Sequence, residues 1–261
     1  MKRGLACLPS APMYERSYMH KDAVSHVSVS HRFEFIFTAS TDGFLKFWKK
    51  AAVGIEFVKT FRAHLTKISG VALSKNEQRL ATVCPMEQTM KLFDVSNFDV
   101  IHIIKLDFTP SVCEFINKTT SLSPLLAIAD AALPKIWIVN SEQSQNEKKS
   151  VVVSEMTYHE TPVRLIRFNQ VYNLVVSTDQ SGVIEVWDPD TLELPDDGRL
   201  AFEVLSDTDY CELVLKKTFA LVVEFSHDGH LMAIFCRDRR IRIFEFKTGK
   251  LVKTYHSETL E

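Results

Sequence analysis

The feature that most constrains the fold of this chain is a short unit that occurs five times. Its first copy reads TASTDGFLKFWKK at residues 38–50, where an apolar strand leads through a polar turn into alternating apolar residues. Each copy closes on an apolar, usually aromatic residue, and the closing positions are Trp48, Phe93, Val139, Trp187 and Phe244. Steps of 45, 46, 48 and 57 residues separate them, a period typical of repeat architectures built from short strands.

This spacing predicts an all-β propeller with about five blades of four strands each. Most copies end in two adjacent apolar residues, as expected of strands that neighbouring blades cover on both faces. Helix-period stripes are scarce, which argues against an α/β fold. We expect an N-terminal extension at 1–16, blades within 17–256 and a short tail at 257–261. The expected units are 17–63, 64–108, 109–158, 159–216 and 217–256.

The first unit contains the residue types of a hydrolase triad, namely His20, Ser40 and Asp42. A catalytic triad occurs once in a chain, whereas these types return with the repeat. A histidine stands 28 or 29 residues before the closing residue of the first, second and fourth units. We therefore predict a structural hydrogen-bond network rather than a catalytic site, because buried polar groups must be paired. The predicted network comprises His20, Ser40, Asp42, Trp48, His64, His159, Ser177, Asp179 and Trp187.

The other units depart from this pattern. The second has Cys84-Pro85-Met86-Glu87 where a turn aspartate is expected, and the third lacks both the histidine and a closing aromatic residue. The fifth keeps Asp238 but has no upstream histidine. We expect the first and fourth blades to be the most regular and the third to be the loosest.

Composition narrows the classes of function. The net charge of −2 gives no reason to expect nucleic-acid binding from bulk electrostatics. The five cysteines are scattered without a CxxC pair, so we predict no metal site, no disulfide framework and no cofactor. The N-terminus lacks the roughly 7–15-residue apolar run of a signal peptide, and no stretch reaches the ~18 apolar residues of a membrane span. We expect a soluble intracellular protein with no membrane or small-molecule partner.

Several long stretches outside the repeat resemble one family, the nuclear cyclophilins known as peptidylprolyl isomerase domain and WD repeat-containing proteins. The resemblance runs from about residue 8 to the C-terminus and lies on the N-terminal WD-repeat propeller of that family. The stretches that carry it are LPSAPMYERSYMHKD (8–22), GIEFVKTFRAHL (54–65), KLFDVSNFDVI (91–101), STDQSGVIEVW (177–187), SDTDYCEL (206–213) and RDRRIRIFEFKTGKLVKTY (237–255).

The resemblance implies a nuclear location, splicing-machinery partners and a prolyl cis–trans isomerase activity that belongs to a separate cyclophilin domain. The chain contains no match to that domain's phenylalanine-histidine-arginine strand or its glutamine-phenylalanine-phenylalanine segment. We therefore expect no isomerase activity from this chain alone. The family's ring is larger than five blades, and GKLVKTYHSETLE leads towards a sixth before it stops. Two arrangements remain open, a closed five-bladed ring or an open arc of an incomplete larger ring, and we favour the arc.

Three segments could bind a partner. RDRRIR places Arg237, Arg239, Arg240 and Arg242 together, either as solvent-facing turn and strand residues or as a rim patch for phosphate or an acidic protein. Residues 141–150 read as a solvated connector. Residues 188–216 form the longest gap between units, where packing and partner binding are both plausible.

These observations rank three hypotheses. The first is a non-catalytic protein-interaction platform, and the second is the targeting part of an isomerase whose catalytic domain lies outside this chain. The third is a module that contacts RNA through the arginine-rich segment.

Overall fold

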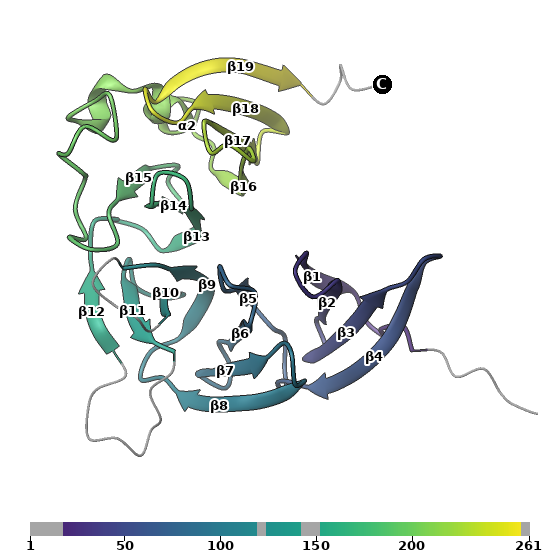
Figure 1. The fold of residues 1–261 in the computed structure, drawn as a ribbon. Helices are drawn as coiled ribbons and strands as arrows, with labels where there is room; N and C mark the ends of the chain where they lie inside the picture. Colours follow the sequence, from purple (N-terminus) through teal and green to yellow (C-terminus); the bar gives the residue numbers. More distant parts are fainter. Residues whose placement is uncertain (1–17, 119–123, 142–151, 257–261) are drawn as a thin grey trace, which may run out of the picture.

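A computed structural model describes residues 18–118, 124–141 and 152–256, and it is almost entirely β-sheet (Figure 1). The expected extension at 1–16 and tail at 257–261 lie outside the described residues. The strands form five antiparallel sheets in chain order, which we call blades 1 to 5. Blades 1 and 2 contain β1 Val24–Ser30, β2 Phe35–Ser40, β3 Phe44–Lys50, β4 Ile55–Arg62, β5 Gly70–Leu73, β6 Arg79–Cys84, β7 Thr89–Asp94 and β8 Asp99–Lys105. Blades 3 to 5 contain β9 Pro110–Ile116, β10 Leu125–Asp130, β11 Ile136–Asn140, β12 Val152–Met156, β13 Val163–Asn169, β14 Leu174–Asp179, β15 Ile184–Trp187, β16 Ala220–Phe225, β17 Leu231–Cys236, β18 Arg240–Glu245 and β19 Lys250–His256.

The blades fan around a common axis with the first strand of each blade innermost (Figure 1). Successive inner strands contact one another, as β1 with β5, β5 with β9, β9 with β13 and β13 with β16. The five-bladed propeller arrangement predicted from the repeat period is therefore confirmed.

Tight turns bring each blade against the next. Gly43 follows β2 with a φ of 83°, and its carbonyl accepts a 3.0 Å hydrogen bond from the His64 backbone N–H of blade 2. A Cβ at Gly43 would lie 2.2 Å from the His64 carbonyl oxygen, so only glycine fits there. Gly182 repeats this arrangement after β14, with a φ of 95° and the Thr218 carbonyl in the same place.

The apolar core is divided between the blade interfaces. Four clusters of buried residues fill the spaces between blades 1 and 2, 2 and 3, 3 and 4, and 4 and 5. A central strand such as β10 contributes to two clusters at once and is buried at every position. Coverage of both strand faces explains why each unit closes on adjacent apolar residues.

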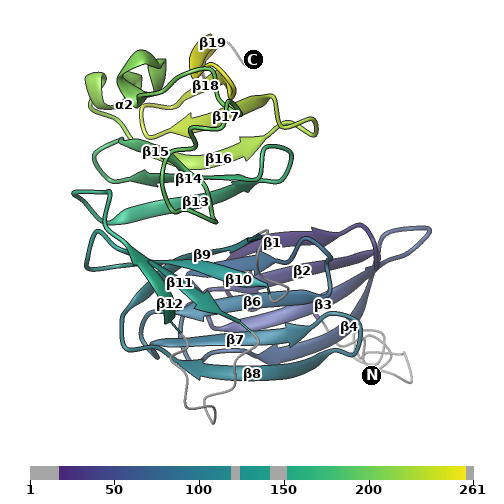
Figure 2. The same cartoon turned by 60° about the vertical axis from the view of Figure 1, so that its left-hand side comes forward.

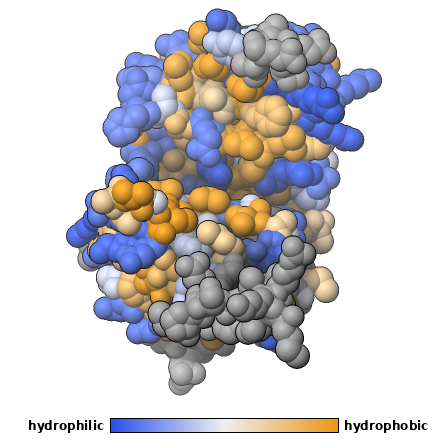
Figure 3. Space-filling model, turned by 90° about the vertical axis from the view of Figure 1, so that its right-hand side faces the viewer, coloured by the Kyte–Doolittle hydropathy of each residue, from blue (hydrophilic) through white to orange (hydrophobic). Residues whose placement is uncertain are grey.

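The arc is open between blade 1 and blade 5, so it is not a closed five-bladed ring (Figure 1). The free face of blade 5 carries the exposed side chains of Val222 and Phe235, on the side opposite its contact with blade 4. Val27 and Val29 are likewise exposed on the free face of blade 1. Figure 3 looks at this side of the molecule and shows the apolar side chains gathered there. Elsewhere in the arc a neighbouring blade covers the equivalent faces.

Blade 4 is less regular in its strand number than the sequence predicted. It has three strands, β13 to β15, whereas the other four blades have four. The expectation that blade 4 would be among the most regular is wrong, because the chain leaves the sheet after Trp187 instead of forming an outer strand. Blade 3 was expected to be the loosest, yet it has four strands and a fully buried β10.

The segment after β15 packs beside blades 4 and 5 (Figure 2). It contains the short helices η1 Leu205–Asp207, η2 Asp209–Cys211 and α2 Glu212–Leu215. Leu200, Phe202, Tyr210 and Leu213 from this segment are buried in the cluster shared by the two blades. None of the helices in the described ranges has the length and apolar character needed to cross a membrane.

Candidate functional site

The predicted hydrogen-bond network is most complete in blade 4. Trp187 Nε1 donates to Ser177 Oγ at 3.2 Å, and Ser177 Oγ lies 2.8 Å from His159 Nε2. His159 Nδ1 lies 3.4 Å from Asp179 Oδ2. Burial alone would raise the pKa of Asp179, but the nearby His159 ring and the hydrogen bonds that the carboxylate accepts from Ser181 and Val183 lower the pKa to about 2. The four side chains thus link the lead-in of the blade to its second and third strands.

Blade 1 contains a shorter version of this network. Trp48 Nε1 donates to Thr38 Oγ1 at 2.8 Å, and Thr38 Oγ1 lies 2.7 Å from His20 Nε2. His20 Nδ1 has no hydrogen-bond partner among the described residues. The Ser40 hydroxyl instead donates to the Asp42 carboxylate within the β2–β3 turn. Ser40 and Asp42 therefore stabilise the turn, while Thr38 bridges the histidine and the tryptophan.

The register of the strands explains this difference from the sequence prediction. In both blades the bridging hydroxyl lies two residues past the cross-strand partner of the tryptophan, which selects Thr38 in β2 and Ser177 in β14. Ser40 occupies the position of Asp179, so the prediction that Ser40 and Asp42 share one hydrogen-bond network with His20 and Trp48 is wrong. The missed signal is a serine or threonine ten residues before the tryptophan.

Blade 2 builds the network from different residues. His64 lies 2.9 Å from Thr82 Oγ1 through Nε2 and 3.0 Å from Glu87 Oε2 through Nδ1. Burial lowers the pKa of His64, so the neutral ring donates from Nδ1 to the carboxylate and accepts the Thr82 proton at Nε2. The Phe93 side chain has no N–H to replace that of the tryptophan, and Thr89 on the third strand instead lies 3.3 Å from His64 Nδ1 and donates to Glu87 Oε2 at 3.1 Å. Glu87 thus takes the role that Asp179 has in blade 4.

A metal ion has one candidate position among the described residues. The ligand atoms of His64, Cys84 and Glu87 lie within 4.8 Å of one another. The histidine and the carboxylate are already hydrogen-bonded to each other, and Cys84 Sγ lies 3.1 Å from Thr66 Oγ1. The repeat itself accounts for two of the three groups, since His159 and a carboxylate meet at the same place in blade 4.

The burial of these networks favours a structural role. Ser177, Asp179 and Trp187 have no exposed surface, and Thr82 is equally buried. A nucleophile or general base needs contact with a substrate, and the side-chain hydrogen bonds of these groups stay within their own blade or the chain that leads into it.

The arginine-rich segment divides into exposed and buried residues. Arg242 is 1% exposed, and its guanidinium donates to both Asp238 oxygens at 3.1 and 2.7 Å. The expectation that Arg242 faces solvent or a partner is wrong, because β18 turns this side chain inward, where Asp238 compensates its charge. Arg240 is half-buried at the start of β18.

Two of the four arginines lie on the surface. Arg239 is exposed at the tip of the β17–β18 turn with a φ of 60°. The guanidinium carbon of Arg237 lies 5.5 Å from the centre of the Phe219 ring, and that of Arg164 in blade 4 lies 4.7 Å from the same ring. Such cation–π contacts hold guanidinium groups without neutralising them. The exposed part of the predicted patch therefore continues from blade 5 to blade 4 through Phe219.

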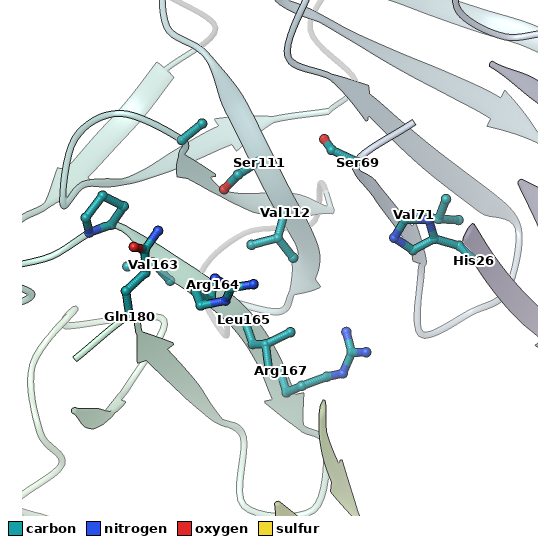
Figure 4. Close-up of a pocket in the computed structure, with 12 residues that line it drawn as sticks. His26, Ser69, Val71, Ser111, Val112, Val163, Arg164, Leu165, Arg167 and Gln180 are labelled. Carbon is teal, nitrogen blue, oxygen red and sulfur yellow. The ribbon is translucent and has the colours of Figure 1, made fainter. Parts of the chain in front are cut away.

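Arg164 also lines a pocket of about 360 Å³ at the mouth of the axial channel, which we call the channel pocket (Figure 4). Its wall comes from four blades, with His26 on β1, Ser69 beside β5, Ser111 on β9 and the start of β13. Figure 4 shows Arg164 and Arg167 on β13 and His26 on the opposite wall. A second recess of about 870 Å³ continues along the inner strands.

Arg167 is the electrostatic centre of this channel. Its guanidinium contacts Glu114 Oε2 at 3.3 Å and Glu224 Oε1 at 3.6 Å, and its Nε donates to the Val223 carbonyl at 3.1 Å. It therefore joins blades 3, 4 and 5. Burial raises the pKa of Glu114 to about 7, and the arginine only partly offsets this effect.

The long segment 188–216 has a structural role over much of its length. Within SDTDYCEL, Tyr210 is buried and donates its hydroxyl to the Phe246 carbonyl at 3.2 Å. Asp209 Oδ2 accepts a 2.8 Å hydrogen bond from the Leu251 backbone. The predicted connector at 141–150 lies outside the described residues apart from Ser141.

Comparison with known proteins places the chain among the WD-repeat proteins. The family model described as WD domain, G-beta repeat, matches residues 14–49 and 55–94. The peptidyl-prolyl cis-trans isomerase CYP71 of Arabidopsis thaliana is 39% identical over 96% of this chain and 39% of that protein. The peptidylprolyl isomerase domain and WD repeat-containing protein 1 of Homo sapiens is 41% identical over 95% of this chain and 38% of that protein. The peptidyl-prolyl cis-trans isomerase 9 of Schizosaccharomyces pombe is 30% identical over 94% of this chain and 39% of that protein.

The chain thus spans less than two fifths of the length of these relatives while matching them over nearly all of its own. The match covers the five blades, the networks that recur in them and the channel between them. WD40 propellers present rigid rims and an axial channel on which other proteins dock, and this chain is such a protein-interaction module. It is a WD-repeat protein, homologous to one segment of the peptidylprolyl isomerase domain and WD repeat-containing proteins.

Proposed function

We propose that this chain docks a cyclophilin-type prolyl isomerase onto protein partners of the splicing machinery in the nucleus. The observation that carries the proposal is the 41% identity, over 95% of the chain, to a relative named for both an isomerase domain and WD repeats. The family-like stretches SDTDYCEL and RDRRIRIFEFKTGKLVKTY support it, because they extend the likeness beyond the repeat motif. The propeller supplies rigid surfaces, and catalysis resides elsewhere.

In this proposal the chain contributes no catalytic residue. The recurring histidine, hydroxyl and carboxylate groups meet within the blades, where His159 Nε2 lies 2.8 Å from Ser177 Oγ and His159 Nδ1 lies 3.4 Å from Asp179 Oδ2. We infer that the isomerase activity named in the relatives belongs to the part of those proteins that lies outside the aligned segment. The chain is the targeting part of a longer product in which a cyclophilin domain performs the reaction.

RNA contact is the alternative function, and one observation favours it. Arg164, Arg237 and Arg239 form an exposed basic strip along the rim of blades 4 and 5. The burial of Arg242 removes one of the four predicted cations from that surface. An RNA-binding rim would give a salt-dependent affinity with a clear log–log slope.

The proposal is tested by capturing partners of the epitope-tagged chain from nuclear extract after nuclease digestion, with quantitative mass spectrometry against the tag alone. We expect enrichment of splicing proteins that survives nuclease treatment. Enrichment that disappears with RNA, or that contains only cytoplasmic proteins, would contradict the proposal. A prolyl isomerase assay on the purified recombinant chain alone should show no acceleration above the uncatalysed rate.

A further inference from the structure

We propose that the channel pocket binds a phosphorylated serine or threonine of a partner protein, with Arg164 and Arg167 holding the phosphate. This inference rests on the proposed docking function and specifies the chemistry of the partner. The expected ligand is a phosphate group on a peptide side chain. This group carries roughly −1.5 to −2 charge at neutral pH and three strong acceptor oxygens.

A β-bulge brings the two arginines to the same side of β13. Residues three apart on a regular strand point to opposite faces, but the pairing of β13 with β14 shifts register between Val163 and Leu165. Arg164 is the extra residue at this shift. Both side chains consequently reach towards blade 5, where Arg164 meets Phe219 and Arg167 meets Val223.

The balance of charge around the pocket favours an anion. Arg164 has no carboxylate within 4 Å among the residues that the structure describes, and it is held in place by the Phe219 ring. Arg167 shares its charge with Glu114 and Glu224. The described residues that line the pocket hold two cations, Arg164 and Arg167, and no carboxylate. Guanidinium groups match phosphate oxygens in geometry.

The shape of the pocket favours one peptide side chain over a nucleic-acid strand. The pocket of about 360 Å³ is lined by four blades, opens to solvent and is large enough to admit a phosphorylated side chain. Val71, Val112 and Leu165 give it an apolar wall against which the carbon atoms of that side chain can pack. Single-stranded RNA is bound through open aromatic platforms, whereas the Phe219 ring is already contacted by the guanidinium groups of Arg164 and Arg237.

The experiment measures binding to the full chain by fluorescence anisotropy. The probes are a degenerate peptide pool with one fixed central phosphoserine, the same pool with serine, and a 20-nucleotide uridylate RNA. We expect the phosphorylated pool to bind at least tenfold more tightly than the serine pool, and Arg164→Gln to remove about tenfold of that affinity. The control variant Lys247→Gln removes an exposed cation from the β18–β19 turn of blade 5 and should leave binding unchanged.

Each other outcome contradicts the inference. Equal affinity for the two peptide pools, or an Arg164→Gln variant that binds the phosphorylated pool as wild type does, would overturn it. RNA binding that depends on Arg164 without phosphopeptide binding would replace it with the RNA module. Gln180→Glu, which places a carboxylate in the wall of the same pocket, provides a second variant if Arg164→Gln fails to fold, and it should weaken binding of the phosphorylated pool. Capture of splicing proteins that persists in Arg164→Gln would leave the docking function intact and reject only this site.

Discussion

Blades 4 and 5 solve the same structural problem with different chemistry. In blade 4 the second and third strands are joined by the bond from Trp187 to Ser177, which continues to His159. In blade 5 the corresponding hydroxyl and tryptophan positions hold Ile234 and Phe244, both buried. The polar link in blade 5 is the ion pair between Arg242 on β18 and Asp238 in the turn between β17 and β18.

The comparison teaches which part of the repeat is obligatory. Both blades bury an aromatic side chain at the closing position and pack both faces of their strands, so apolar coverage is shared. The hydrogen-bonded chain is present in one blade and absent from the other, so it is not required for a blade to form. Buried polar networks fix one arrangement among several, while most of the stabilisation comes from burial.

The largest change should follow from removing the shared feature. Trp187→Ala deletes a fully buried indole, and we expect a loss of about 3–5 kcal/mol in the free energy of unfolding. Trp187→Phe reproduces the residue of blade 5 and should lose only about 1 kcal/mol, from the hydrogen bond to Ser177. Chemical denaturation measures both, and equal losses would mean that the hydrogen bond, not the ring, holds the blade.

A smaller loss should follow from breaking the ion pair of blade 5. Asp238→Ala leaves the buried guanidinium of Arg242 without its carboxylate, and we expect roughly 2–3 kcal/mol of destabilisation. The double variant Asp238→Ala with Arg242→Met should recover most of that loss, because no charge then remains buried. Failure of the double variant to recover would show that the pair organises the turn itself. Denaturant midpoints at constant m-value give the comparison.

The network of blade 4 should give the fold an acid-sensitive component. The pKa of Asp179 is lowered to about 2, so its stabilisation is present above pH 4 and is lost as the pH falls towards 2. We expect on the order of 2 kcal/mol from this group. Asp179→Asn should remove that part of the pH dependence. A variant with the same acid profile as wild type would assign the sensitivity to other carboxylates.

The channel should give a smaller dependence of opposite sign. Burial raises the pKa of Glu114 to about 7, so the stabilisation of its protonated form is complete below pH 4.5 and is lost as the pH rises through 7. The side chain keeps 22% exposure, and we expect about 1 kcal/mol. Glu114→Gln should flatten thermal stability between pH 5 and 8. An unchanged slope in this variant would place the titration on another group.

The sequence predicted the architecture because the determinants of a blade are local. Alternating apolar residues and the positions of Trp48 and Trp187 are enough to place strands, and the period of the units gives the propeller. The bridging hydroxyl lies ten residues before the tryptophan in both blades, and either serine or threonine can supply it. Thr38 was missed because the prediction considered only serine at this position.

The candidate binding surface was less predictable from the sequence. Arg237 and Arg239 were recognised because they are adjacent in the chain, and Arg242 was misassigned with them. Arg164 and Arg167 lie some 70 residues earlier and reach the same rim only through the packing of blade 4 on blade 5. Contacts between blades carry no local pattern, so the channel pocket could be found only in three dimensions.

The central claim is that the recurring polar residues stabilise blades while partner binding occurs at the mouth of the channel. The most direct measurement determines, for Ser177→Ala and Arg164→Gln side by side, the melting temperature and the affinity for the phosphoserine peptide pool. We predict that Ser177→Ala lowers the melting temperature and leaves the affinity of the folded protein unchanged. Arg164→Gln should leave the melting temperature unchanged and lower the affinity. Loss of affinity in a folded Ser177→Ala variant, with Arg164→Gln unaffected, would contradict the claim and place function in the network of blade 4.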